Sequence, residues 1–256
     1  MQELKGKVAI VMGASTAGGL GEATARRLAK EGATVVVSGL GAEHLDKLAR
    51  ELGGSAFEAD ITDRDQVRAL VNHAISTNGS VHIGVNLAGS SDRMAISDMT
   101  EEHLLKMTKI NYFGSVWFVQ QVAERIVDGG AIVCTSSFAA YDPVSGLTGY
   151  ATAKRAADRF IQAAAVEYRH KRLRINSIIP STIDTSILRK AMSEYGLEFD
   201  SFAKTVIDVT PLGRLARPED IASMILMMVR DEYFETGQNL HCSGGNSLLG
   251  HPRSLA

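Results

Sequence analysis

Two side chains that can exchange a proton and hold a charge lie four residues apart in the stretch YATAK, from Tyr150 to Lys154. The surrounding residues 148–168 read as a helix, and a spacing of four places both side chains on one helical face. A free phenol has a pKa of about 10, but a nearby cation favours the phenolate. At roughly 4 Å and an effective dielectric of about 20, such a charge contributes about 4 kcal/mol. We therefore expect Tyr150 to act as a general acid/base whose pKa is lowered by Lys154.

A serine and an asparagine offer further polar groups to this chemistry. Ser137 ends a predicted strand thirteen positions before Tyr150, and its hydroxyl can stabilise charge on a reacting oxygen. Asn111 lies inside a predicted helix, where asparagine is mildly unfavourable, which hints at a role beyond folding. Each residue alone is more often an ordinary helix or turn residue, whereas the four together indicate a catalytic site.

The stretch VMGASTAGGLGEATA (11–25) places several glycines between a predicted strand and a predicted helix. Such a turn presents backbone N–H groups and the positive end of a helix dipole to a phosphate. We expect Gly13 to form the turn and Gly18 to widen it. Gly19 would admit a pyrophosphate, and Gly21 would let the helix pack closely on the sheet. A tight turn without a ligand is the alternative that this stretch alone leaves open.

Apolar runs alternate with helical patterns along the rest of the chain, as in a parallel sheet buried on both faces. Strands are predicted at 7–13, 33–39, 55–60, 81–89, 130–137, 173–180 and within 236–245. Helices are predicted at 20–32, 42–53, 63–77, about 100–127, 148–168 and 217–230. The fold expected is α/β, a Rossmann-type doubly wound parallel sheet of about seven strands flanked by helices on both faces. It would form one domain (1–256), with an irregular stretch at about 181–216 as a lid over the substrate.

Residues at the ends of two more predicted strands fit a dinucleotide. Asp60 ends the third strand, where a carboxylate can accept a hydrogen bond from an adenine amino group. The stretch NLAG (86–89) ends the fourth strand with residues that let a dinucleotide lie across the sheet edge.

As an ordered set, these motifs resemble those of the classical short-chain dehydrogenase/reductase family over almost the full chain. The set comprises the glycine loop, Asp60, NLAG, INYFG with Asn111, TSS ending in Ser137, YATAK, and PSTIDT (180–185). The chain departs from the family pattern in the glycine loop. Met12 stands where the family has threonine, and two extra residues separate Gly13 from the final GLG. Ser181 also replaces the glycine of a Pro-Gly pair.

The resemblance implies an NAD(P)-dependent oxidoreductase that transfers a hydride between a nicotinamide cofactor and a secondary alcohol or ketone. Tyr150 would be the general acid/base, and Ser137 would bind the substrate oxygen. Asn111 would hold a water that passes protons from Lys154 to solvent. Lys154 would also bind the nicotinamide ribose, and Thr185 the carboxamide. The implied cofactor contacts are Gly13, Ser15, Gly19, Leu20, Gly21, Gly39, Asp60, Ile61, Asn86, Ala88, Gly89, Tyr150, Lys154, Pro180, Ile183 and Thr185.

The type of nicotinamide cofactor depends on the end of the second strand. An acidic residue there selects NAD, and an arginine binds the 2′-phosphate of NADP. The chain has Gly39 and Leu40 at this point. Because a dianionic phosphate needs cations whereas ribose hydroxyls accept neutral partners, the sequence favours NAD(H). Ser15 and Ser38 keep NADP(H) open.

Apolar residues on the substrate side indicate a hydrophobic ketone or secondary alcohol, cyclic and steroid-like molecules included, unless several of them belong to the core. They are Met94, Tyr141, Val144, Ile187, Leu188, Met192, Tyr195 and Phe202. The resemblance also implies that the helices at about 100–127 and 148–168 pair in dimers or tetramers. The tail 246–256 could reach a neighbouring subunit.

Composition argues against several other functions. A net charge of −2 over 256 residues gives no basic surface for nucleic acid or for an anionic membrane. Cys134 and Cys242 lie in apolar segments and are expected to be small buried thiols. The histidines show no metal-ligand spacing, so no metal is expected. Without a signal peptide or an apolar run of about 20 residues, we expect a cytoplasmic protein.

Three other functions are weighed against the oxidoreductase. A non-catalytic nicotinamide-binding redox sensor is the main alternative, although it would not need all four catalytic residues. A Ser-His-Asp hydrolase is disfavoured because the sequence has no G-x-S-x-G motif. An enoyl reductase is disfavoured because relatives of that type space the tyrosine and the lysine more widely than YATAK does.

Overall fold

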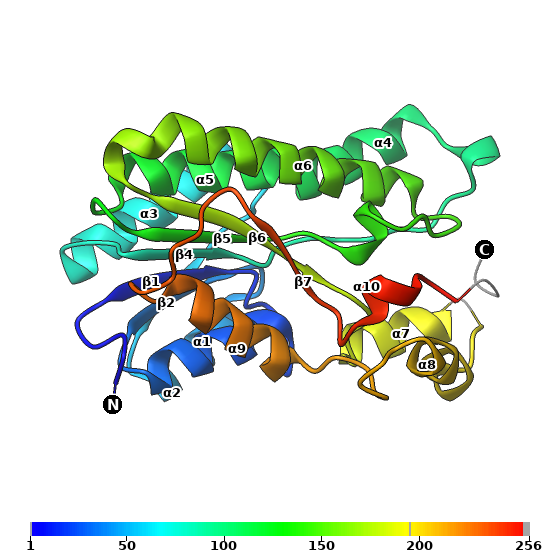
Figure 1. The fold of residues 1–256 in the computed structure, drawn as a ribbon. Helices are drawn as coiled ribbons and strands as arrows, with labels where there is room; N and C mark the ends of the chain where they lie inside the picture. The colour runs from blue at the N-terminus through cyan, green and yellow to red at the C-terminus, as the bar shows by residue number, and fades with distance from the viewer. Residues whose placement is uncertain (1, 195, 253–256) are drawn as a thin grey trace.

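The computed structural model describes residues 2–194 and 196–252, and its strands form one seven-stranded parallel sheet (Figure 1). The strand order is β3-β2-β1-β4-β5-β6-β7. The strands are β1 (Val8–Met12), β2 (Thr34–Gly39), β3 (Ser55–Glu58), β4 (Ile83–Asn86), β5 (Ala131–Thr135), β6 (Arg174–Pro180) and β7 (Asn239–Cys242). The doubly wound Rossmann-type fold predicted from the sequence is confirmed.

Helices cover both faces of this sheet (Figure 1). One face packs against α1 (Leu20–Lys30), α2 (Ala42–Leu52) and α9 (Pro218–Val229), and the other against α3 (Arg64–Asn78), α5 (Gly114–Arg125) and α6 (Thr148–Glu167). Strand β1 shows why the strands read as continuous apolar runs. Ile10 and Met12 join the core under α3, α5 and α6, whereas Ala9 and Val11 join the core under α1 and α9, because successive strand side chains point to opposite faces.

The helix predicted at about 100–127 is interrupted. It consists of α4 (Glu101–Thr108), a π-helical turn at Lys109–Phe113, and α5. Asn111 lies in the π-helical turn, and its side-chain amide donates to the carbonyl oxygen of Met107 at 3.0 Å. This side chain competes with the backbone for a helical acceptor, which locally widens the helix.

The segment 181–216, predicted to be irregular, contains two helices, α7 (Ser186–Glu194) and α8 (Phe199–Asp208). Ala203, Val206 and Leu215 form a small core of their own, separate from the two cores of the sheet. These helices are short and amphipathic, and their apolar residues face a local core and a cavity rather than the sheet. The alternation of strands and helices therefore gave no signal for them.

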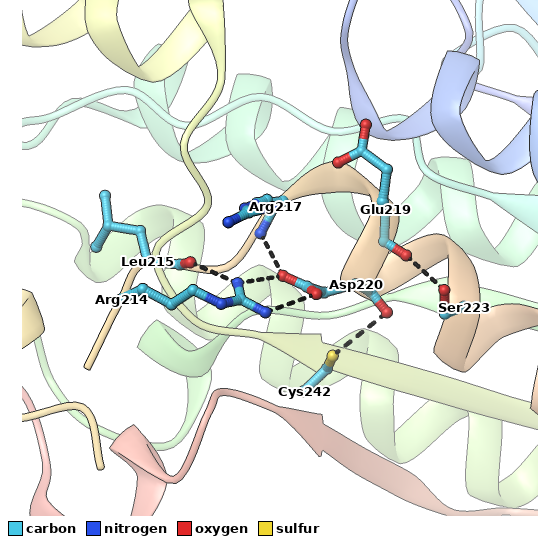
Figure 2. Close-up of polar contacts among 7 residues, drawn as sticks. All are labelled: Arg214, Leu215, Arg217, Glu219, Asp220, Ser223 and Cys242. Atoms are coloured by element: carbon cyan, nitrogen blue, oxygen red, sulfur yellow. Dashed lines mark hydrogen bonds and ion pairs between the residues drawn. The ribbon is translucent and has the colours of Figure 1, made fainter. Parts of the chain in front are cut away.

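The end of this segment is fixed to α9 by an ion pair and a helix cap (Figure 2). The guanidinium of Arg214 donates to both carboxylate oxygens of Asp220, at 2.6 and 2.9 Å. The Asp220 carboxylate also accepts the backbone N–H of Arg217 at 2.7 Å, which caps the first turn of α9. These donors hold the pKa of Asp220 below its usual range. The Cys242 thiol contacts the Asp220 carbonyl oxygen and so links this corner to β7.

Beyond β7 the chain folds back on itself instead of leaving the molecule. A short helix α10 (Asn246–Leu249) lies at the same end as α7 and α8 (Figure 1). The backbone N–H of His251 donates to the Asp142 carboxylate, and the His251 ring lies 4.7 Å from that of Phe138. Within the tail that could reach a neighbouring subunit, His251 packs on its own chain, and residues 253–256 lie outside the described part. No helix in residues 2–194 and 196–252 has the length and apolar composition needed to cross a bilayer.

Candidate active site

The candidate site lies at the carboxyl edge of the sheet, between β1 and β4. Strands β2 and β3 lie on one side of β1, and β4 to β7 lie on the other. In open parallel sheets this switch point leaves a crevice in which ligands bind. Two cavities open there, a larger one of about 940 Å³ and a smaller one of about 470 Å³. Leu87, Gly89, Ser90 and Ile187 line both, so the two form one continuous cleft.

Most of the predicted cofactor residues lie along this cleft. Those that line the larger cavity are Gly13, Ser15, Gly39, Asp60, Ile61, Ala88 and Gly89. Those that line the smaller cavity are Gly19, Leu20, Gly89, Tyr150, Lys154, Pro180, Ile183 and Thr185. Ser137 lines the smaller cavity as well, so the residues predicted to transfer a proton and the glycine turn share one cleft.

The glycine turn is shaped by two close backbone approaches. Gly13 has a φ of +94°, and a Cβ there would lie 2.5 Å from the backbone nitrogen of Ala88. A Cβ on Gly21 would lie 2.2 Å from the carbonyl oxygen of Gly13. Gly18, which we expected to widen the turn, has a φ of +68°. The turn thus brings the N-terminus of α1 against the end of β1, a cradle that fits a pyrophosphate.

The end of β2 holds an arrangement that the sequence alone did not reveal. The Ser15 hydroxyl accepts the backbone N–H of Leu40 at 2.8 Å, and a Cβ on Gly39 would lie 2.1 Å from that hydroxyl oxygen. Ser15 therefore occupies the space that a side chain at position 39 would need. The Glu58 carboxylate, from the end of β3, accepts the backbone N–H of Gly41 at 2.7 Å, which adds a negative charge beside this loop.

Lys154 is a buried ammonium beneath Tyr150. Its residue is 1% exposed, and its Nζ donates to the carbonyl oxygen of Thr135 at 2.9 Å. Burial lowers the pKa of Lys154 to about 8. A Cβ on Gly89 would lie 3.2 Å from the same Nζ, so the glycine of NLAG leaves room beside this charge. A small group such as a ribose hydroxyl can approach the ammonium through that gap.

The pKa of Tyr150 differs from the sequence-based expectation. Burial raises it, the negative charge of Asp158 raises it further, and a hydrogen bond with the Ser137 hydroxyl lowers it in part. The Nζ of Lys154 lies 6.0 Å from the centre of the Tyr150 ring and is directed to Thr135 instead. In this state the phenol is held protonated, as a proton donor must be before it reacts.

Asn111 and two of the predicted cofactor residues line neither cavity. The Asn111 amide donates to the carbonyl oxygen of Ser90 at 2.8 Å, and its oxygen accepts the Ser90 N–H at 3.3 Å. These two hydrogen bonds fix the position of the loop after β4. Asn86 is buried and its side chain accepts the N–H of Ala88 at 3.0 Å. Gly21 packs against Gly13, as described above. Asn111, Asn86 and Gly21 thus do not line the cleft themselves but contact the backbone segments that do.

Some of the apolar residues predicted for the substrate side line a cavity. Val144, Ile187, Leu188, Met192 and Phe202 line the smaller cavity. Met94 and Tyr141 line neither cavity, and Tyr195 lies outside the described residues. The lining residues that we did not predict include Arg93, Phe138, Leu147, Ala191 and His251. They come from loops, α7 and the C-terminal tail, whose places around the cavity depend on the fold rather than on any motif.

A buried carboxylate that belongs to none of the predicted motifs lies next to the site without lining it. Asp158 is 2% exposed and follows Lys154 by one turn of α6. It accepts the hydroxyls of Ser136 at 2.6 Å, Ser177 at 2.8 Å and Tyr141 at 2.9 Å. The three donors come from the end of β5, from β6 and from the loop after β5. Asp158 therefore ties the segment that carries Ser137 to the helix that carries Tyr150.

Comparison with known proteins covers nearly the whole chain. Residues 13–247 match a family model described as "Enoyl-(Acyl carrier protein) reductase". A 3-oxoacyl-(acyl-carrier-protein) reductase from Thermotoga maritima is 31% identical, over 94% of this chain and 98% of the relative. The 7alpha-hydroxysteroid dehydrogenase of Escherichia coli K12 is 33% identical, over 94% of each chain.

A solved structure agrees with these relatives. The structure of a short-chain type dehydrogenase/reductase from Mycobacterium ulcerans matches with a TM-score of 0.88 and 28% identity, over 97% of this chain and 92% of that one. With matches of this length in sequence and in fold, the chain belongs to the short-chain dehydrogenase/reductase family of oxidoreductases.

Proposed function

We propose that the protein transfers a hydride between a nicotinamide cofactor and a secondary alcohol or ketone, with Tyr150 as the general acid/base. The observation that carries this proposal is the continuous cleft, which has the glycine turn at one end and Ser137, Tyr150 and Lys154 at the other. The close approaches at Gly13 and Gly21 and the gap at Gly89 fit a dinucleotide that lies across the sheet edge.

In the direction of reduction, a bound nicotinamide supplies the hydride, and the protein must supply a proton to the carbonyl oxygen. The protonated phenol of Tyr150 donates a hydrogen bond to that oxygen and then the proton. The Ser137 hydroxyl, which lines the same cavity as Tyr150, donates to the same oxygen and stabilises the charge that develops on it. In the direction of oxidation, Tyr150 takes the proton back.

Lys154 and Asn111 support this proton transfer. The Lys154 ammonium binds the ribose hydroxyls and offsets the charge left on Tyr150 after the proton has gone. The Asn111 side chain positions the Ser90 backbone and would hold a water that links Lys154 to solvent. In this proposal Thr185 binds the carboxamide, and α7 and α8 act as the lid over the substrate.

The loop after β2 supports NAD(H) as the cofactor. Leu40 is 58% exposed at the larger cavity, and the Glu58 carboxylate is bonded to the next residue. The cations that line this cavity are Lys106 and Lys109, which come from α4 and the π-helical turn rather than from this loop. A 2′-phosphate next to Leu40 would therefore meet a negative charge.

The assembly and compartment predicted from the sequence also stay as proposals. Exposed apolar side chains on α4 and the π-helical turn, among them Leu104, Leu105 and Phe113, support association of copies through this helical layer. The free thiols of Cys134 and Cys242 fit the reducing cytoplasm. We therefore propose a cytoplasmic homo-oligomer, a dimer or tetramer.

A panel of ketones and secondary alcohols assayed with each cofactor tests the proposed function. We expect oxidation of NADH that depends on an apolar ketone, with weaker use of NADPH. Cyclohex-2-enone serves as a discriminating substrate, because reduction of its carbonyl leaves the double bond intact. Cyclohexanone as the product would support an enoyl reductase instead. Tight NADH binding without turnover of any ketone or enone would favour the non-catalytic sensor.

A further inference from the structure

An arginine lines the smaller cavity on the side of the substrate. Arg93 follows β4 in a loop whose Met94 N–H donates to the carbonyl oxygen of Gly146 at 2.9 Å. A Cβ on Gly146 would lie 3.6 Å from the Arg93 Cβ, so the stem of this side chain packs against the loop at residues 143–147. Arg93 is half-buried. Its place at the cavity is therefore set by backbone pairing between two loops.

The charges around this cavity are unbalanced. Arg93 and Lys154 line it, and within residues 2–194 and 196–252 no aspartate or glutamate does. The Lys154 ammonium is already bonded to the Thr135 carbonyl. Carboxylates in the two loops have other partners, since Asp92 pairs with Lys106 at 3.1 Å and Asp142 accepts the N–H of His251. No ion pair or side-chain hydrogen bond joins Arg93 to another described residue.

Apart from Arg93 and Lys154, no other side chain in the described wall of this cavity carries a positive charge at pH 7. Phe138, Val144, Leu147 and Phe202 are apolar, and burial keeps the pKa of His251 below its usual range, so its ring is neutral at pH 7. An arginine at a cavity that also has several apolar side chains and, among the described residues, no carboxylate matches a ligand with an apolar body and an anionic end. A planar carboxylate can accept two parallel N–H bonds from this group.

We propose that the substrate is an apolar ketone or secondary alcohol that also carries a carboxylate, and that Arg93 binds this carboxylate. The inference rests on the proposed function for the identity of the reacting group, but the anion site can be tested without turnover. Arg93 lines the smaller cavity together with Val144 and Phe202 of the predicted substrate surface, and it does not line the larger cavity at Gly13 and Asp60. We therefore assign Arg93 to the substrate, and parallel measurement of cofactor binding separates this role from one toward the nucleotide.

Calorimetric titration of the protein saturated with NAD⁺ provides the test, with decanoate and its neutral analogue decanamide as probes. Wild-type protein is expected to bind decanoate about tenfold more tightly than decanamide, the gain of one charge-assisted contact. Arg93→Gln should remove this difference and leave decanamide binding unchanged, while Arg93→Lys should keep part of it. Arg68→Gln, which removes an exposed arginine on α3, is the matched control and should behave as wild type.

Wild-type protein that binds decanoate no more tightly than decanamide, including binding neither, would overturn the proposal. An Arg93→Gln variant that keeps the preference would also overturn it. NADH binding is measured in parallel and should be equal in wild type and Arg93→Gln, since a loss there would assign Arg93 to the cofactor. A decanoate preference without turnover of any ketone would leave the anion site standing and would contradict the proposed function instead.

Discussion

At the scale of single residues, the free protein holds the two groups proposed for proton transfer, Tyr150 and Lys154, in a resting arrangement. The Lys154 ammonium is bonded to the Thr135 carbonyl, and burial holds the pKa of Tyr150 above its usual range. In the proposed mechanism this arrangement keeps the Tyr150 phenol protonated until a substrate oxygen accepts its proton. Lys154 then becomes the group whose charge decides the pH range of activity.

The pH dependence of catalysis should follow Lys154. Its pKa in the folded protein is about 8, lowered by burial, so the ammonium is present below this pH and is lost as the pH rises through it. We expect kcat/KM for NADH in ketone reduction to fall about tenfold per pH unit above about pH 8. In Lys154→Arg the guanidinium keeps its charge, so the residual kcat/KM of this variant should no longer fall above about pH 8. A profile that stays flat to pH 10 in wild type would contradict the assignment.

The four catalytic candidates could be proposed from the sequence because each stands in a local motif, and a spacing of one helical turn places Tyr150 and Lys154 on one helical face. The pKa of Tyr150 could not be predicted, because it depends on burial and on Asp158, a residue without a motif. Arg93 and His251 escaped prediction for a similar reason. They are far apart in the chain, and only the closure of loops and tail around one cavity brings them together.

At the scale of elements, hydrogen bonds from several segments hold the site in shape. Asp158 on α6 accepts hydroxyls from the end of β5, the loop after β5, and β6. The long predicted helix at about 100–127 breaks where the Asn111 amide takes a helical carbonyl. Hydrophobic periodicity predicted the main strands and helices well, since these are buried on defined faces. It could not predict α7 and α8, which pack on a core outside the sheet.

Replacement of Asp158 by asparagine should weaken the link between these elements. An amide cannot accept all three hydroxyls, so buried donors lose a partner at a cost of about 1–3 kcal/mol. We expect the free energy of unfolding in urea to fall by this amount, together with a lower kcat because Ser137 shifts. Tyr141→Phe removes one donor only and leaves no buried donor unpaired, so it should cost about 0.5 kcal/mol, less than Asp158→Asn. An Asp158→Asn protein as stable as Tyr141→Phe would argue against the network.

The cap of α9 should be sensitive to acid. The pKa of Asp220 is lowered by Arg214 and by the Arg217 N–H, so its contribution to stability is present above the unfolded-state pKa and is lost as the pH falls through the folded-state pKa. Asp220→Asn should therefore lower the free energy of unfolding by about 1 kcal/mol at pH 7. The difference from wild type should shrink below about pH 4. A difference that stays constant down to pH 2 would assign the effect to packing.

At the scale of the whole molecule, the cleft joins the two halves of the sheet. Its lining comes from the β1–α1 turn on one side and from β4, β5, α6, β6, α7 and the C-terminal tail on the other. A ligand that spans the cleft contacts both halves at once. The doubly wound topology could be predicted from the alternation of strands and helices. The contact of the tail with Asp142 could not be predicted, since no sequence pattern in residues 246–252 indicates which residue they contact.

Binding of the dinucleotide should stabilise the entire fold by mass action. At a free NADH concentration of 100 times its Kd, the gain is about 2.7 kcal/mol, which corresponds to a rise of about 5–10 °C in Tm for a chain of this size. NADPH at the same concentration should give a smaller rise, because of the charge of Glu58 beside the loop after β2. Equal rises would remove the preference for NAD(H), and the absence of any rise with either cofactor would remove the cleft as a dinucleotide site.

The central claim is that Tyr150 gives and takes the proton during hydride transfer. The most direct measurement compares wild type with Tyr150→Phe in single-turnover oxidation of bound NADH by a ketone substrate identified in the panel. Loss of the phenol hydroxyl should slow this step by at least about 100-fold, while the Kd for NADH, measured by fluorescence titration, changes by no more than about twofold. A Tyr150→Phe protein that binds NADH normally and oxidises it at the wild-type rate would contradict the account.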